Sequence, residues 1–220
     1  MRKSALIIAV SIFLSISSSS YAQSPQISTG LAWLNSAQTI TGNWPGVETN
    51  EYYSTAAALD TLYVLQPSSS AYTTAFTWLS GQIASPTDYL ARRIIALKRA
   101  GLDATAEMEG LLLYRDSAGG WGINSGFDDG IMDTSLALQA LHAANYADTT
   151  IIYQALNFLT SHQNADGGWG FVDQDGNQVS NTYYTAMVLN TLSLYKSTFI
   201  FQASITNAVN YLLSKHNLDG

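Results

Sequence analysis

The stretch from Asp128 to Thr134 holds the residues best suited to acid–base chemistry. Asp128 and Asp129 are adjacent, and Asp133 follows after a short gap. Two carboxyl groups that lie close together raise the pKa of one of them, which makes it a proton donor near neutral pH. Asp128 and Asp129 also suit a second role, because carboxylates are favourable at the positive end of a following helix. We favour helix capping and keep an acid pair as the alternative, with Asp133 as a third candidate acid.

A second acidic stretch, from Asp173 to Ser180, resembles part of a calcium-binding loop. Asp173, Asp175 and Asn177 supply oxygen ligands at alternate positions, as such loops require. The bidentate glutamate expected at the twelfth position is missing, because Tyr184 stands there. Asp and Asn side chains also stabilise turns by accepting hydrogen bonds from nearby backbone amides. We therefore expect a metal-free turn, with calcium binding as the alternative.

The sequence contains few residues that could form a zinc site or a nucleophilic active site. The chain has no cysteine, and its three histidines, His142, His162 and His216, fall on three different predicted helices. A zinc site needs several cysteine or histidine ligands together. No Ser–His–Asp arrangement or phosphate-binding loop is evident in the sequence either. We expect no cofactor.

The elements that position these residues are predicted to be helices. Apolar residues recur every three or four positions, which is the helical period, and no stretch shows the alternation of a β-strand. We therefore expect no strands. The predicted helices are approximately Ser28–Gln38, Asn50–Leu65, Ser70–Gln82, Pro86–Ala100, Ala104–Tyr114, Gly130–Ala144, Thr149–His162, Asn181–Tyr195 and Gln202–Lys215.

One motif recurs where predicted helices end. An aromatic residue and a leucine are followed by a glutamine, a glycine and a tryptophan at fixed offsets. The first copy carries Gln38 and Trp44, and the second carries Gln163, Gly167 and Trp169. A looser copy ends at Trp121, and a further one begins at Tyr211. Recurrence at a fixed spacing is typical of helical repeat proteins.

This spacing resembles the QW repeat of the squalene–hopene cyclase and prenyltransferase superfamily. The resemblance implies an all-α fold, an α/α toroid of helical hairpins with inner and outer rings of helices. It further implies that Gln38 and Gln163 hydrogen-bond the N-terminus of a neighbouring helix, with Trp44 and Trp169 stacked over the amide. Such bonds would satisfy backbone groups that helix ends leave without partners.

The predicted hairpins form an incomplete arc. Nine helices make about four and a half hairpins, fewer than a complete toroid of the superfamily has. The chain also stops at Gly220, where the motif next requires a tryptophan. We expect residues 23–220 to form one repeat domain that is truncated at its C-terminus.

The resemblance also places a cavity at the starts of the inner helices. Tyr53, Tyr183, Tyr184 and Thr134 stand at such starts when the inner helices are aligned on their leucines. They are the candidate cavity lining, and the alternative is that they only pack and cap the helices.

Catalysis by the cyclase mechanism is not expected. Class II terpene cyclases protonate their substrate with an Asp-x-Asp-Asp-Thr motif, whose middle Asp is the acid. Asp133 and Thr134 match the end of that motif, but Met132 replaces the acid and Gly130 replaces the first Asp. A thioether cannot donate a proton.

The first 22 residues have the features of a secretory signal. Arg2 and Lys3 precede an apolar run that is shorter than the roughly 20 residues of a spanning helix, and Ser20-Tyr21-Ala22 suits cleavage. We therefore expect a secreted, periplasmic or cell-surface protein without a membrane span after cleavage. Cleavage removes two of the nine basic residues, so seven remain against sixteen acidic ones, a net charge of −9. Such a chain is a poor partner for nucleic acid.

Three functions from different classes fit these observations. We favour a secreted or surface repeat module that binds a small hydrophobic or polar ligand, or further repeats or domains of the same protein, without catalysis. The alternatives are a diverged extracytoplasmic terpene cyclase or lyase-like enzyme, and a ligand carrier similar to transcobalamin.

Overall fold

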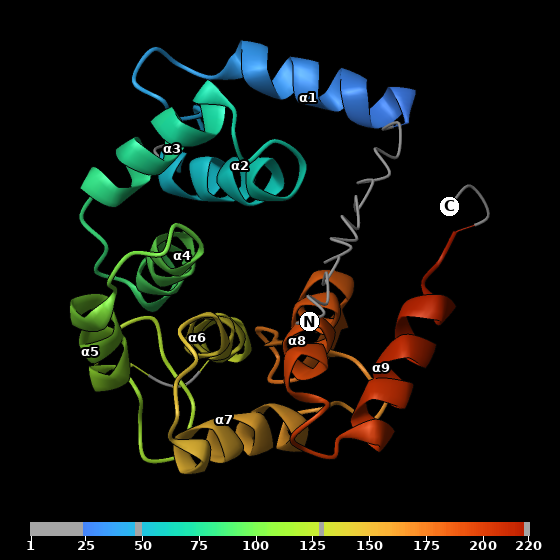
Figure 1. Cartoon of the computed structure of the whole chain (residues 1–220). Coiled ribbons are helices and arrows are strands. Elements are labelled where there is room, and N and C mark those ends of the chain that lie inside the picture. Colours follow the sequence, from blue (N-terminus) through green and yellow to red (C-terminus); the bar gives the residue numbers. More distant parts are fainter. Residues whose placement is uncertain (1–23, 47–49, 128–129, 218–220) are drawn as a thin grey trace, which may run out of the picture. The chain divides into compact units, whose positions relative to one another are not determined.

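A computed structural model describes residues 24–46, 50–127 and 130–217 (Figure 1). Backbone contacts divide the chain into two compact units, residues 1–37 and 38–220. The first unit contains α1 (Pro25–Ala37), on which Trp33 is 66% exposed. The second unit contains the other elements, and the proposed signal segment lies outside the described residues.

The described part of the second unit is almost entirely helical, as the sequence predicts. Its helices are α2 (Glu51–Leu65), α3 (Ser70–Gly81), α4 (Thr87–Arg99), α5 (Thr105–Leu113), α6 (Ile131–Ala143), α7 (Thr149–Ser161), α8 (Thr182–Tyr195) and α9 (Gln202–Ser214). Each agrees with a helix predicted from the apolar period to within a few residues at its ends. The all-α assignment is confirmed.

The helices alternate between inner and outer positions. The inner helices α2, α4, α6 and α8 pack in that order, and each packs against the helix that follows it in the chain. Figure 1 shows α3, α5 and α7 on the outer side of α2, α4 and α6. This is the arrangement of helical-hairpin repeats, in which each hairpin buries its apolar surface against its neighbours.

The inner helices are buried because they carry small and aliphatic residues on several faces. Ala91 and Ile94 on α4 and Ala137 and Leu138 on α6 are fully buried. Alanine allows the two helix backbones to approach closely, and the leucine and isoleucine side chains fill the remaining space. The outer helices instead bury one apolar face. On α7 this face includes Ile152, Ala155 and Leu159.

One prediction about secondary structure is wrong, because the structure contains a β-hairpin. Strand β1 (Trp169–Val172) pairs antiparallel with β2 (Gln178–Asn181). Each strand has four residues, too few for an alternating pattern to stand out in the sequence. Gly170 permits the close pairing, because a Cβ there would lie 1.8 Å from the carbonyl oxygen of Val179.

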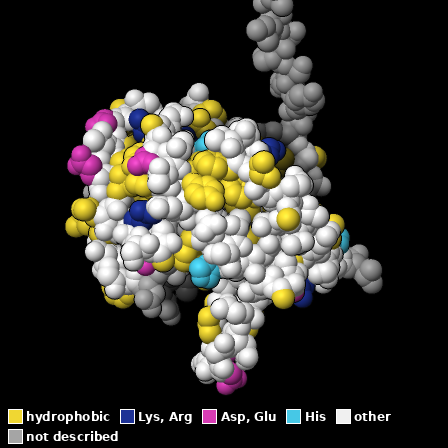
Figure 2. Space-filling view, turned by 90° about the horizontal axis from the view of Figure 1, so that it is seen from below, with side chains coloured by type: hydrophobic (Ala, Val, Ile, Leu, Met, Phe, Trp, Pro, Cys, Tyr) yellow, Lys and Arg dark blue, Asp and Glu magenta, His cyan; other side chains and the backbone are white. Residues whose placement is uncertain are grey.

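The surface is poor in charge. Charged residues make up 11% of the sequence, and Figure 2 shows one face that is covered mainly by uncharged polar groups and backbone, with hydrophobic patches between them. Within the described residues, no helix combines the length and the apolar character that a membrane span requires.

Candidate functional site

The motif tryptophans connect an outer helix to the next inner helix. The indole nitrogen of Trp169 donates a hydrogen bond to the carbonyl oxygen of Leu159 in the last turns of α7 (2.6 Å). Its backbone N–H donates to the hydroxyl of Thr185 on α8 (3.0 Å). Both side chains are fully buried. One residue therefore satisfies a carbonyl at the end of one helix and is itself held by the start of the next.

The looser motif copy makes the same two contacts. Trp121 donates from its indole to the Leu111 carbonyl (2.7 Å) and from its backbone N–H to the hydroxyl of Thr134 (2.9 Å). In the first copy, the backbone N–H of Trp44 donates to Thr55 (3.0 Å). The buried threonines on the inner helices thus pair with the motif tryptophans.

This pairing corrects the expected role of Thr134. Thr134 has no exposed surface, since its hydroxyl is held against Trp121. It belongs to the repeat scaffold and cannot contact a ligand in a cavity. Alignment on the inner-helix leucines finds the threonine positions, but it does not show which face of the helix they occupy.

The motif glutamine and glycine join neighbouring outer helices. The amide nitrogen of Gln163 donates to the carbonyl oxygens of Gly167 (2.8 Å) and of Ser204 in the first turn of α9 (2.9 Å). Gly167 has φ 88°, and a Cβ there would lie 2.6 Å from the carbonyl oxygen of Asn207 on α9. The turn is therefore pressed against the next outer helix, at a distance that only glycine tolerates.

The other copies reach their neighbours in related ways. Gln38 donates to the carbonyl oxygens of Gly42 (2.9 Å) and of Ala71 on α3 (2.9 Å). In the looser copy Arg115 stands in the glutamine position, and its guanidinium donates to the side chain of Gln154 on α7. The looser copy therefore keeps the link with a longer donor.

The starts of the inner helices converge on a buried ion pair. Asp88, at the start of α4, is 3% exposed and pairs with Arg92 one turn later. The Arg92 guanidinium lies 5.2 Å from the centre of the Tyr53 ring on α2, a cation–π distance. One of the predicted cavity residues, Tyr53, is thus held by an arginine from the neighbouring inner helix.

Asp88 and Arg92 were not among the functional residues predicted from the sequence. Arg92 could have been found, because it occupies the same position as Asp133 when the inner helices are aligned on their leucines, and both residues are charged. Asp88 was harder to find, since nothing in its sequence neighbours distinguishes a buried aspartate from a helix-capping one.

Asp133 is the best described candidate for an ionisable functional group. Burial, and to a smaller extent the negative charge of Asp88, raise the pKa of its carboxyl from 3.8 to about 6. Asp128 and Asp129 lie outside the described residues. Asp133 is therefore the one predicted acid whose surroundings the structure describes.

Asp133 lines a cavity of about 410 Å³ between the start of α6, the end of α7 and the hairpin. Its other walls include Met132, Tyr184, Phe158 and Phe171, which are apolar or aromatic. The remaining lining residues are Gly130, Ile131, His162, Gly170, Val172 and Gln178. Tyr184 is thus the predicted tyrosine that shares a cavity with Asp133. Tyr53 lies beside Arg92, and Tyr183 is largely exposed, with its ring against that of Tyr184. The volume falls in the range of small-molecule sites.

The acidic loop and the histidines have local partners. The Asp173 carboxylate accepts hydrogen bonds from the backbone N–H groups of Asp175 (3.0 Å) and Asn177 (2.8 Å) and from the Asn177 side chain (3.1 Å). It thereby shapes the turn of the β-hairpin. His162 contacts the carbonyl of Phe158 (2.8 Å). No group of three or more His, Asp or Glu side chains in the described segments could hold a metal ion.

Helical hairpins closed by glutamine–glycine–tryptophan turns define a domain of the α/α-toroid repeat class. The chain belongs to the squalene-hopene cyclase C-terminal domain family, whose model matches residues 107–220. This confirms the resemblance that the motif spacing suggests.

A solved structure has a similar fold. It is described as a protein from Actinoplanes and is 18% identical, with a TM-score of 0.63. The similarity covers 87% of this chain and 65% of that one, so the chain spans less than two thirds of the solved protein's length. No curated protein matches the chain.

Proposed function

We propose that the protein is an exported repeat module that binds a small molecule at the Asp133 cavity and does not cyclise it. The ligand has an apolar body and a hydrogen-bond acceptor. The apolar body fits the walls formed by Met132, Phe158, Phe171 and Tyr184, and the acceptor fits the carboxyl group of Asp133. Export rests on the signal-like first 22 residues.

The observation that carries the proposal is the position of Asp133, whose carboxyl group stands among the apolar and aromatic walls of this cavity. Met132, whose thioether cannot donate a proton, occupies the place of the acid in the cyclase motif. A neutral carboxyl group in an apolar wall is instead a good hydrogen-bond donor, as long as the pH is below its pKa. The site is therefore better suited to binding than to cyclase-type protonation.

The binding test uses geranylacetone, a ketone that accepts hydrogen bonds and donates none. We expect its affinity to be highest near pH 5 and to fall several-fold as the pH rises through about 6, because Asp133 then loses its proton. Asp133→Asn should bind with little dependence on pH, since an amide donates at every pH in this range. Titration calorimetry at several pH values measures both profiles.

The control is Asp175→Asn, which changes an acidic residue on the nearby hairpin that does not line the cavity. This variant should keep the profile of the unmodified chain. No measurable binding of the ketone, or an unchanged pH profile in Asp133→Asn, would contradict the proposal.

Stability provides an independent check on Asp133. Its folded pKa lies above its ordinary value of 3.8, so the folded state binds the proton more tightly than the unfolded state. Stability from this group is therefore full below about pH 4 and declines as the pH rises to about 6. After allowance for solvent screening, the loss should be about 1–2 kcal/mol. In Asp133→Asn this decline in stability should be absent. Urea unfolding at pH 4.5 and at pH 7.5 measures the free energy of unfolding of both proteins.

An enzymatic alternative remains, because Asp133 and Thr134 match two positions of the cyclase acid motif within the residues that the family model covers. Incubation of the chain with squalene, followed by product analysis, tests it. Formation of a cyclic product that Asp133→Asn abolishes would favour the cyclase over the binding module.

A further inference from the structure

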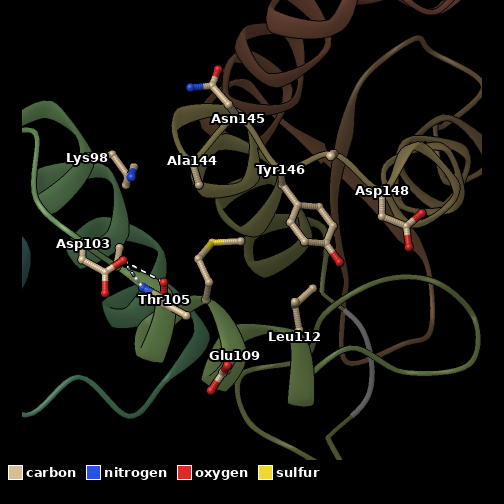
Figure 3. Close-up of a pocket in the computed structure, with 12 residues that line it drawn as sticks. Lys98, Asp103, Thr105, Glu109, Leu112, Ala144, Asn145, Tyr146 and Asp148 are labelled. Atoms are coloured by element: carbon tan, nitrogen blue, oxygen red, sulfur yellow. Dashed lines mark hydrogen bonds between the residues drawn. The ribbon is translucent and has the colours of Figure 1, made fainter.

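A second cavity lies at the opposite ends of the inner helices. It is about 420 Å³ in volume and is formed where α4 and α6 end and where α5 and α7 begin (Figure 3). It shares no residue with the Asp133 cavity. None of the site residues predicted from the sequence lines this cavity.

The cavity has an apolar wall on α5. Thr105, Met108, Glu109 and Leu112 all line it, and their spacing of three, four and seven residues places them on one face of that helix. Tyr146 stands on the opposite side, and Figure 3 shows its ring above Leu112. An aliphatic chain could pack between these side chains.

The opposite wall is held in place by the end of α6. The backbone N–H of Tyr146 donates to the Leu141 carbonyl (2.9 Å), and that of Asn145 donates to the His142 carbonyl (3.0 Å). Asn145 has φ 51°, so these bonds form the Schellman arrangement that ends many helices. The backbone that carries the Tyr146 ring is therefore held in place.

The edge of the cavity is acidic. Three carboxylates, Asp103, Glu109 and Asp148, line it together with one cation, Lys98. In Figure 3, Asp103 and Asp148 lie on opposite sides of the Tyr146 ring, and Glu109 lies below it. Two helices end at this cavity and two begin there, so the contributions of their dipoles to the local electrostatic potential offset one another. The charged side chains therefore determine the sign of that potential.

Asp103 is ionised at neutral pH. A hydrogen bond from the hydroxyl of Thr105 (2.7 Å) lowers the pKa of its carboxyl, and backbone amides act in the same direction. Its carboxylate remains exposed to solvent and accessible to a ligand.

A neighbouring cavity provides an internal comparison. It is about 330 Å³ in volume and shares Asn145 and Tyr146 with the first one. Its polar lining includes Thr149, Thr198 and His142, and no carboxylate lines it. The two cavities thus lie on either side of the same loop and differ in their acidic edge.

We propose that the cavity between α5 and the α6–α7 loop binds a small organic cation with an aliphatic body, of the alkylammonium class. The aliphatic body contacts Met108, Leu112 and Tyr146, and the ammonium group lies at the edge of the cavity that carries Asp103 and Glu109. The pairing of an apolar wall with an excess of negative charge at its edge selects this chemistry over neutral or anionic ligands of the same shape.

The test compares three ligands of equal length, hexylammonium, 1-hexanol and hexanoate, by nuclear magnetic resonance titration of the full chain. Hexylammonium should shift the signals of Met108, Leu112 and Tyr146 and bind about fivefold more tightly than hexanol, while hexanoate binds most weakly. This preference should shrink in high salt, because exposed charges are screened.

Two variants assign the preference to the acidic edge. Glu109→Gln changes an exposed carboxylate on the cavity-lining face of α5 and should reduce the preference for hexylammonium over hexanol. Asp103→Asn together with Glu109→Gln removes two negative charges from the edge and should nearly abolish the preference. Asparagine can still accept the hydrogen bond from Thr105, so the start of α5 should keep its structure. Asp175→Asn, on the hairpin, is the charge-matched control and should change nothing.

Three results would overturn the proposal. These are equal affinity for hexylammonium and hexanol, an unchanged preference in the double variant, and signal shifts centred on Thr198 and Phe199 of the neighbouring cavity instead of Met108 and Leu112.

Discussion

The turn that follows α7 and the turn that follows α3 join equivalent helices by different chemistry. After α7, Trp169 is fully buried and donates to the carbonyl of Leu159, while Thr185 on α8 holds its backbone N–H. After α3 there is no tryptophan, and Arg93 occupies the position on α4 that corresponds to Thr185. Its guanidinium donates to the carbonyl of Gln82 (2.5 Å), just after the end of α3.

The arginine also makes a link to the next outer helix. It forms an ion pair with Glu107 on α5 (3.0 Å), and both side chains are largely buried. The difference shows what the repeat requires, which is a donor for the carbonyls at the end of the outer helix and an anchor on the inner helix. In one turn an indole is the donor and a threonine on the inner helix is the anchor. In the other, Arg93 supplies both, because its guanidinium is the donor and the residue itself stands on the inner helix α4.

The largest expected effect comes from Trp169→Ala. Deletion of a fully buried indole should destabilise the chain by roughly 3–5 kcal/mol, which for a chain of this size lowers the melting temperature by about 6–20 °C. Trp33→Ala is the control, because that ring is 66% exposed, and it should cost far less. Thermal unfolding followed by circular dichroism measures both. Equal costs would mean that the motif turn does not hold the repeat together.

Next in size is Thr185→Val, which keeps the shape of the side chain and removes the hydroxyl. The backbone N–H of Trp169 is then buried without its acceptor, at a cost of about 1–3 kcal/mol. Thr185→Ser retains the hydroxyl and should lose less. A valine variant as stable as the serine variant in urea unfolding would show that the hydrogen bond contributes nothing.

Arg93→Met should have a smaller effect, of about 1–2 kcal/mol, because it leaves Glu107 without its ion-pair partner. This effect should decrease in 1 M salt, whereas the effect of Trp169→Ala should not, since salt screens charges and does not weaken apolar packing. Arg99→Met removes a more exposed pair with Asp60 and serves as the surface reference. Identical salt dependence at Arg93 and Trp169 would remove the proposed distinction between the two turns.

The smallest effect concerns the hairpin after α7, which holds both strands found in the described residues. Its Asp173 carboxylate already accepts hydrogen bonds from Asp175 and Asn177, so we expect millimolar calcium to leave the melting temperature unchanged. A ligand that binds only the folded state must raise that temperature. A rise that Asp175→Ala abolishes would show that a metal takes part in this turn.

The helices and the positions of the motif turns can be predicted from local patterns in the sequence. The apolar period that predicts α2 to α9 is local, and so is the spacing from Gln163 to Trp169. Helix ends need partners wherever they occur, and glycines and tryptophans at fixed offsets indicate how this chain supplies them. The β-hairpin escaped prediction because its short strands pair through Gly170, a contact that leaves no period in the sequence.

The roles of the polar residues at the inner-helix starts depend instead on how the helices pack, which separates those that hold the repeat together from those that line the candidate site. Thr134 is buried against Trp121, Tyr53 packs on Arg92, and Asp133 and Tyr184 share a cavity, although all four stand at similar places in the repeat. The outcome depends on which face of each helix meets its neighbour. That is set by packing between helices far apart in the chain, because burial and the approach of distant charges such as Asp88 fix what each side chain can do.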